Sequence, residues 1–292
     1  MRIARFLSPD GVRLGVLRDD DTIVDLTAAG LPTDLPQVLA DGGSLARMAE
    51  MASAPGAVVV AREDVQLLAP VGRPPKFLAI GLNYADHVAE SETPKPDHQL
   101  WFNKQSTCVV GPGEPIHIPK ASSVVDYEGE MAFVIGRRCR HVPAARASEV
   151  IAGYTVVNDV SVRDWQRRTP TMTMGKSFDT HGPMGPWMVT ADELGDPHRL
   201  RLRTWVNDDL RQDSTTDNLI FDCWQMIEHL STAFTLEPGD VISTGTPGGV
   251  GIARTPPMLL QHGDIVRIEV DGIGVLENPV IDEPDSTATG LD

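Results

Sequence analysis

The sequence is poor in cysteine, aromatic residues and positive charge, and each shortage excludes a class of protein. Its 292 residues include only three cysteines, which are widely separated and form no CxxC pair. Neither a disulfide framework nor a cysteine-based metal site is therefore expected. Lysine and arginine number 25 against 41 acidic residues, which gives a net charge of −16. Because phosphate contacts require a basic face, this balance argues against nucleic-acid binding.

Long apolar segments and several familiar catalytic motifs are also missing. The unbroken apolar run at residues 57–61 is far too short to span a bilayer. The first residues contain no apolar stretch long enough for a signal peptide, so we expect a cytoplasmic protein without membrane contact. The sequence has no GxSxG or HExxH motif, and Gly175-Lys176-Ser177 lacks the earlier glycine of a nucleotide-binding loop. Serine-hydrolase, zinc-protease and nucleotide-loop interpretations therefore have no support.

Turn-forming residues, by contrast, are abundant. The 26 glycines and 23 prolines, with only 5% aromatic residues, indicate many turns between short strands. The expected class is therefore α+β, rich in strands and with few helices. The segment 69–75, rich in proline and glycine, predicts a boundary between a small α+β domain at 1–70 and a larger domain at 71–282. The polar segment 283–292 is expected to form a disordered tail.

Apolar patterning predicts the main helices and strands. In the first unit it predicts strands at 2–6, 13–17 and 22–26, and a helix at 44–52 with Ser44 as its N-cap. In the larger unit it predicts strands at 76–81, 130–135, 154–157, 200–206, 264–270 and 273–276. Helices are predicted at 83–91 and 221–234, with a polar loop at 92–99.

Two carboxylates are predicted to share one face of a strand. Glu128 and Glu130 lie two residues apart beside the strand at 130–135, and side chains at that spacing point the same way. Such close like charges are costly unless they are neutralised, and Mg²⁺, Mn²⁺ or Ca²⁺ prefers oxygen ligands of this kind. A solvated edge strand with alternating acids is the alternative. Asp159, which follows the strand at 154–157, could add a third carboxylate or could serve an Asx turn or helix N-cap.

Three further features could take part in catalysis. His87 and Glu90 lie one helical turn apart, and an imidazole held by a carboxylate is a general base for water. A surface helix with a chance pair is the alternative. Lys176 could bind a substrate carboxylate or an enolate. The glycine-rich segment 244–251 could present backbone N–H groups to an anion, or could be a plain turn region.

Taken together, five segments resemble the motifs of the fumarylacetoacetate hydrolase family and follow its order. They are Gly-Leu-Asn-Tyr-Ala-Asp-His at 81–87, Asp-Tyr-Glu-Gly-Glu at 126–130, Asn158-Asp159 through Arg163-Asp164 to Gln166, Gly-Lys-Ser-Phe-Asp at 175–179, and Thr-Gly-Thr-Pro-Gly-Gly-Val-Gly at 244–251. The resemblance covers about residues 76–281. The N-terminal unit resembles the extension of the longer bacterial members. In one departure, residues 101–105 stand where many members read Phe-Leu-Lys-Pro, with Lys104 retained.

The resemblance implies a fold, a metal site and a set of site residues. The fold is a β-rich catalytic domain, a mixed roll of the family's own type. Glu128, Glu130 and Asp159 would hold a divalent metal, usually Mg²⁺ or Mn²⁺. His87 and Glu90, on a lid, would activate water, and Lys176 would help to stabilise an enolate. The positions that match substrate contacts are Arg163, Gln166, Lys176, Gly245 and Thr246. A homodimer is also implied, because the family commonly forms one.

The reaction that the resemblance implies is hydrolysis of a carbon–carbon bond in a β-diketone 2-oxo acid during catabolism. An acylpyruvate or a 2,4-diketo-3-deoxy sugar acid would be the substrate, and a metal-bound enolate would form. Oxaloacetate decarboxylation uses the same site without an attacking water, and isomerisation or tautomerisation of a 2-oxo acid needs only proton transfer. A non-catalytic binding protein is a further alternative, but every matched polar position is filled here.

Overall fold

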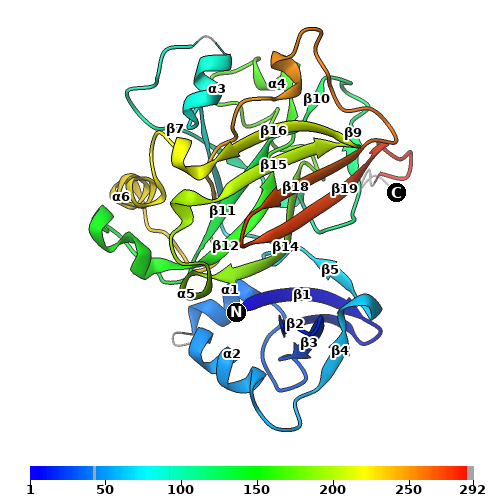
Figure 1. The fold of residues 1–292 in the computed structure, drawn as a ribbon, viewed down its shortest axis with the longest axis vertical. Helices are drawn as coiled ribbons and strands as arrows, with labels where there is room; N and C mark the ends of the chain where they lie inside the picture. The colour runs from blue at the N-terminus through cyan, green and yellow to red at the C-terminus, as the bar shows by residue number, and fades with distance from the viewer. Residues whose placement is uncertain (42–43, 92, 288–292) are drawn as a thin grey trace.

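The computed structural model describes residues 1–41, 44–91 and 93–287, and its main feature is one large β-sheet (Figure 1). This 12-stranded sheet has the order β4-β3-β2-β1-β14-β12-β11-β17-β6-β7, with β5 paired to β1 and β8 paired to β14. Two smaller sheets have the orders β10-β13 and β16-β15-β18-β19-β9. The predicted α+β fold, rich in strands and with few helices, is confirmed. Across the described ranges, no helix is both long and apolar enough to cross a membrane.

The N-terminal unit is an antiparallel meander covered by two helices, at the bottom of Figure 1. Its elements are β1 (Arg2–Ser8), β2 (Gly11–Leu17), β3 (Thr22–Asp25), α1 (Leu35–Ala40), α2 (Ser44–Ala52), β4 (Val59–Ala61) and β5 (Gln66–Leu68). The predicted strands and the helix at 44–52 are present, whereas α1 was not predicted. The N-cap side chain predicted at Ser44 lies outside the described residues. Apolar side chains of this unit pack in one cluster with Phe77, Met188 and Val241 from the rest of the chain.

The described residues after β5 form the other strands and the helices α3 to α6. These elements are β6 (Phe77–Gly81), α3 (Ala85–Glu90), β7 (Leu100–Lys104), β8 (Val109–Val110), β9 (Ile116–Ile118), β10 (Val125–Asp126), β11 (Gly129–Ile135), β12 (Ile151–Asn158), β13 (Ser161–Val162), α4 (Arg163–Gln166), β14 (Gly182–Thr190), α5 (Ala191–Leu194), β15 (Arg201–Val206), β16 (Asp209–Thr215), α6 (Cys223–Ala233), β17 (Val241–Ser243), β18 (Ile265–Val270) and β19 (Gly274–Asp282). In the segment predicted as a disordered tail, Glu283 donates its backbone N–H to Ile118 at 2.9 Å. Residues 288–292 lie outside the described ranges.

Strands β11 and β12 form the centre of the main sheet. Every residue of both strands is buried, which accounts for their nearly continuous apolar sequences. Their antiparallel register pairs Gly129 with Asn158 and Glu130 with Val157. Since β11 also pairs with β17, the alternative of a solvated edge strand at these glutamates is wrong. The register brings the start of β11 to the end of β12, where Asp159 follows.

The second large sheet packs over the face of the first. Strands β18 and β19 contact β12, and β15 contacts β11, so apolar residues of both sheets form one core. Helices α3 and α4 lie near each other at the top of the view in Figure 1. Side chains from these two helices line a common cavity, described below. Helices α3 and α4 therefore lie at one end of the molecule, close to the ends of β6 and β11.

A buried histidine is expected to make the stability of this fold depend on pH. Burial lowers the pKa of His181, just before β14, to about 3, although its ring Nε2–H donates a hydrogen bond to the His117 carbonyl oxygen at 2.7 Å. The unfolded chain takes up this proton near pH 6.5, so stability is full above that pH and is lost as the pH falls towards 3. The loss approaches about 1.4 kcal/mol per pH unit.

A matched variant isolates this effect. His181→Gln keeps an N–H donor for the carbonyl of His117 but has no group that titrates in this range. Urea unfolding at pH 7, 6 and 5 should therefore show a flatter dependence of the unfolding free energy in the variant. Equal slopes for the two proteins would contradict the role given to His181.

Candidate functional site

A small cavity of about 210 Å³ lies where α3, α4, β6 and the start of β11 meet. Its polar wall consists of His87, Glu128, Glu130, Arg163, Gln166 and Lys176, with Thr246 beside them. Its apolar wall consists of Ile80, Leu82, Leu100, Phe102 and Met172. We call this space the inner cavity. It brings together residues from all five segments that resemble the family's motifs.

Three carboxylates converge at the inner cavity. Glu128, Glu130 and Asp159 are buried, and each offers an oxygen atom within 4.8 Å of the others. Backbone contacts fix this convergence, because the N–H of Glu128 donates to Asn158 Oδ1 at 3.0 Å and the N–H of Asp159 donates to the Glu128 carbonyl at 2.9 Å. The two strand ends are therefore held side by side by hydrogen bonds, as the predicted cluster requires.

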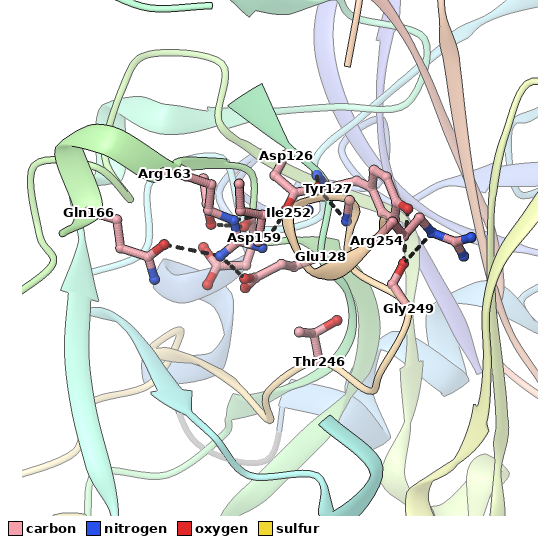
Figure 2. Close-up of polar contacts among 12 residues, drawn as sticks. Asp126, Tyr127, Glu128, Asp159, Arg163, Gln166, Thr246, Gly249, Ile252 and Arg254 are labelled. Atoms are coloured by element: carbon pink, nitrogen blue, oxygen red, sulfur yellow. Dashed lines mark hydrogen bonds and ion pairs between the residues drawn. The ribbon is translucent and has the colours of Figure 1, made fainter. Parts of the chain in front are cut away.

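Three buried cations surround these carboxylates. The Nζ atom of Lys176 lies 2.7 Å from both Glu128 Oε2 and Asp159 Oδ2, and Nζ of Lys104 lies 2.6 Å from Asp159 Oδ1. Arg163 bridges Glu128 at 2.6 Å and Asp126 at 2.7 Å, as Figure 2 shows. Three cations thus face four carboxylates when Glu130 is included. The fully ionised cluster carries one negative charge more than its cations neutralise.

Glu130 is the carboxylate of the cluster that is least compensated by positive charge. Burial opposes ionisation of Glu128, but Lys176 and Arg163 outweigh it and lower the pKa of Glu128 to about 2. The pKa of Glu130 is raised well above its ordinary value by burial and by the charges of Asp159 and Glu128. Glu130 accepts hydrogen bonds from the Ser243 hydroxyl and from the Gly245 N–H.

This donor set fits a divalent cation. Three buried carboxylate oxygens within reach of one point are the ligands that Mg²⁺ and Mn²⁺ prefer. A bound cation would also supply the positive charge that Glu130 lacks. The residues present therefore fit the metal that the sequence predicts, and the choice between these metals stays open.

His87 and Glu90 both lie beside the cavity, but they are not hydrogen-bonded. Nδ1 of His87 lies 3.6 Å from Glu90 Oε2, beyond hydrogen-bond reach, and among the described residues this buried nitrogen has no hydrogen-bond partner. Glu90 instead accepts the backbone N–H of Gly249 at 2.9 Å through both oxygens. Burial opposes ionisation of Glu90, but His87 and this N–H outweigh it and lower the pKa of Glu90. The pair is in place, with the His87 ring nitrogen uncommitted.

The predicted substrate contacts are partly engaged with the protein itself. The side-chain Oε1 of Gln166 accepts a hydrogen bond from Arg163 at 3.0 Å, and its Nε2, among the described residues, donates only to the Met172 sulfur at 3.7 Å. The Thr246 hydroxyl donates to the Gly129 carbonyl at 2.9 Å. The N–H of Gly245 binds Glu130 at 2.9 Å, so it orients a carboxylate instead of facing the cavity. Gln166 is the predicted contact with the freest donor.

Two residues of the cluster were not predicted as site residues. Lys104 lies on β7, and its ion pair with Asp159 joins positions 55 residues apart, which no local pattern reveals. Asp126 accepts the N–H groups of Gly251 and Ile252 at 2.8 and 2.9 Å while it binds Arg163, as Figure 2 shows. Asp126 therefore fastens the glycine-rich segment to the acidic cluster. Its place in the Asp-Tyr-Glu-Gly-Glu segment was the one available signal.

The sequence of this chain is similar to those of known proteins. Residues 76–281 match the family model described as Fumarylacetoacetate (FAA) hydrolase C-terminal, and residues 1–70 match one described as Rv2993c-like, N-terminal. A mitochondrial oxaloacetate tautomerase of Xenopus laevis is 42% identical over 288 residues, which cover 96% of this chain and 90% of that protein.

Two solved structures extend the comparison. The 5-carboxymethyl-2-hydroxymuconate delta-isomerase from Mycobacterium smegmatis is 39% identical, with a TM-score of 0.78, and the match covers 97% of this chain and 100% of that one. The maleylpyruvate hydrolase from Sphingobium sp. SYK-6, in complex with manganese (II) ion and pyruvate, is 34% identical with a TM-score of 0.81 and the same coverage. Proteins similar to this chain thus carry names of three different reactions.

Proposed function

This chain is an enzyme of the fumarylacetoacetate hydrolase family, as its motifs predicted, and on that premise we propose that it interconverts the enol and keto forms of a small 2-oxo acid such as oxaloacetate. The observation that carries the proposal is the inner cavity. Its volume of about 210 Å³ is below that of most ligand sites, and it combines one uncommitted imidazole with an acidic triad suited to a metal. The proposal favours one of the alternatives over the hydrolysis that the sequence analysis ranked first.

The residues of the cavity suit a proton transfer. A metal held by Glu128, Glu130 and Asp159 would act as a Lewis acid towards the two oxygens of a 2-oxo acid. His87 is the group placed to move a proton between carbon and oxygen, because its Nδ1 has no other partner among the described residues. The Glu90 carboxylate, 3.6 Å from Nδ1, is bound by the Gly249 N–H, so it would flank the imidazole without binding it, and Gln166 would donate its Nε2–H to a substrate oxygen.

The remaining residues of the cavity would keep Glu128 ionised and exclude water. Arg163 and Lys176 keep Glu128 ionised, which preserves it as a ligand. The apolar wall, including Leu82 and Phe102, would limit the access of water, and tautomerisation requires no water as reactant. The relative named oxaloacetate tautomerase, at 42% identity, supports this reaction class.

Hydrolysis of an acylpyruvate is the second candidate. A second hollow of about 550 Å³ adjoins the inner cavity, with which it shares His87, and Glu90 lines this second hollow. An acyl group leaving the reacting carbon would have room there, with the water-activating pair beside it. The similar structure of a maleylpyruvate hydrolase with manganese (II) ion and pyruvate supports this candidate. The homodimer, the cytoplasmic location and the catabolic role remain predictions.

Product analysis distinguishes these reactions. The purified protein with Mg²⁺ or Mn²⁺ would be offered the enol form of oxaloacetate and, in parallel, acetylpyruvate, each with an EDTA control. We expect faster loss of the enol, with keto oxaloacetate as the product. Acetate and pyruvate from acetylpyruvate would favour the hydrolase, and CO₂ and pyruvate from oxaloacetate would favour a decarboxylase. Turnover that EDTA does not reduce would contradict the metal-dependent site.

A substitution at His87 tests the proposed base. His87→Gln keeps a polar side chain of similar reach but cannot accept and return a proton at neutral pH. We expect kcat to fall by about 10²- to 10⁴-fold, the usual contribution of a general base, with Mn²⁺ affinity unchanged. The exposed His98 offers a control, and His98→Gln should retain full activity. A His87→Gln protein with native kcat would refute the assignment.

A further inference from the structure

The inner cavity and the second hollow share part of their lining. The hollow, which we call the outer hollow, has a volume of about 550 Å³ and shares four lining residues with the inner cavity: His87, Arg163, Gln166 and Met172. Three of these four belong to the proposed chemistry. Met172 is the only shared residue with an apolar side chain and no assigned role. Its position in both linings makes it part of the wall between the two spaces.

The backbone of Met172 supports a functional reason for its position. Its φ angle of 57° lies in the left-handed region, which residues other than Gly, Asn and Asp rarely adopt. Such strained positions gather at ligand sites, because the surrounding structure must hold them. Here the N–H of Met172 donates to the Thr169 carbonyl at 3.2 Å, and its sulfur accepts from Gln166 Nε2 at 3.7 Å. The segment is therefore held in a turn that directs this flexible side chain to the cavity.

The lining of the outer hollow also includes a cation. Arg167 lines the hollow, and among the described residues it forms no ion pair. Its neighbour Arg168 differs, because it lies 3.5 Å from Asp164 and stacks on the Trp165 ring at 3.9 Å from the centroid. The acid that lines the same hollow, Glu90, is bound by the Gly249 N–H. An exposed guanidinium with no ion pair among the described residues therefore gives the lining of the hollow a group that can bind an anion.

We propose that Met172 divides one substrate site into two subsites and thereby sets the length of 2-oxo acid that the enzyme accepts. The inner cavity takes the 2-oxo acid end, and the outer hollow takes whatever extends beyond Met172, with a preference for a carboxylate at Arg167. This inference rests on the proposed function, because it assumes that the 2-oxo acid end lies at the metal triad. It adds the determinant of substrate length and the charge of the distal group.

Binding measurements test the division directly. Isothermal titration calorimetry with Mn²⁺ present would use oxalate, which fills the inner cavity only, and two six-carbon acids, 2-oxohexanoate and 2-oxohexanedioate. In Met172→Ala we expect both six-carbon acids to bind roughly 10-fold more tightly than in the wild type, with oxalate unchanged. Met174→Ala is the matched control, because Met174 lies on the same turn segment but is 59% exposed. It should change none of the three affinities.

A second pair of variants tests the charge preference. Arg167→Gln in the Met172→Ala background should weaken 2-oxohexanedioate roughly 5-fold and leave 2-oxohexanoate unchanged. Arg168→Gln is the control and should alter neither acid. Equal weakening of the two acids by Arg167→Gln would overturn the carboxylate role of Arg167.

The outcomes separate this inference from the proposed function. If oxalate binds every variant but Met172→Ala does not favour the longer acids, the division by Met172 is wrong and the metal site stands. If oxalate fails to bind the wild-type protein with Mn²⁺, the proposed function is wrong. Met172→Gly provides a second variant, since glycine adopts a φ of 57° without strain and removes the same side chain. Unaltered preferences in a folded Met172→Gly protein would likewise refute the proposal.

Discussion

Replacing Glu130 with glutamine is expected to abolish metal-dependent turnover while leaving the metal-free protein at least as stable as the wild type. Among the described residues Glu130 forms no ion pair, and its pKa is raised well above normal by burial and by two neighbouring carboxylates. A neutral amide removes that repulsion, and its oxygen can still accept from Ser243 and Gly245. The same change removes one of three metal ligands. We expect a loss of at least about 10³-fold in kcat/KM, equivalent to roughly 4 kcal/mol.

Two measurements on Glu130→Gln check this pair of effects. Thermal unfolding in EDTA should give a Tm equal to or above that of the wild type, and Mn²⁺ titration should show weakened binding. Glu149→Gln is a control of the same chemistry, because Glu149 is exposed and forms a surface ion pair with Arg146. It should keep both metal binding and activity. Native Mn²⁺ affinity in Glu130→Gln would show that the triad is not the metal site.

Replacing Lys104 with methionine should destabilise the metal-free protein strongly, and a divalent cation should reverse much of the loss. The Lys104 side chain is completely buried, and its Nζ lies 2.6 Å from Asp159 Oδ1. Removal of one partner leaves a buried carboxylate with less compensation, which typically costs about 3–5 kcal/mol. A metal at the triad would resupply positive charge beside Asp159, so Mn²⁺ should raise Tm more in the variant than in the wild type.

An exposed lysine provides the contrast for this experiment. Lys120 pairs with Asp285 at 3.0 Å, with side chains 54% and fully exposed. Lys120→Met should change the unfolding free energy by less than about 1 kcal/mol, and Mn²⁺ should stabilise it no more than the wild type. If Lys104→Met behaved like Lys120→Met, the ion pair with Asp159 would not support the cluster. Chemical unfolding with and without Mn²⁺ measures both quantities.

The sequence was most informative where local pattern and tertiary environment agree. The strands beside Glu130 and Asn158 were predictable because both are nearly continuous apolar runs, which is the pattern that burial on both faces produces. The helix α6 was predictable from its apolar stripe. Its N-terminus is fixed by Asp222, which forms a capping box with Gln225.

Strand β14 shows where local pattern fails. Its sequence begins Gly182-Pro183 and contains Gly185-Pro186, residues that normally argue against a central strand. It is nevertheless buried and pairs with β12 on one side and β1 on the other. Its pairing partners include residues as distant in sequence as Arg2 and Gly153. The strand therefore forms because β1 and β12 provide hydrogen-bond partners on its two sides. No local propensity can show that.

The charge network of the site could be predicted only in part. The carboxylates were visible because Glu128, Glu130 and Asp159 lie in short polar segments at strand ends. Their neutralisation was not, because Lys104 reaches Asp159 from a strand 55 residues away, and Lys176 was expected to face a substrate instead of pairing with Glu128 and Asp159. The inner and outer spaces, and the place of Met172 between them, depend on side-chain packing and a left-handed backbone residue. Such features need coordinates.

The pairing of β1 with β14 makes the strands of the first 70 residues part of the same β-sheet as the rest of the molecule. Arg2 and Ile3 pair with Val189 and Met188, and the apolar cluster beneath them draws on both parts of the chain. Without the N-terminal strands, β14 would present an unpaired edge beside uncovered apolar side chains. Such an edge recruits strands from other chains and leads to aggregation. The N-terminal unit therefore covers the β14 edge of the sheet and protects it from pairing with other chains. Because the two parts share a sheet and an apolar cluster, they should unfold together in one cooperative transition.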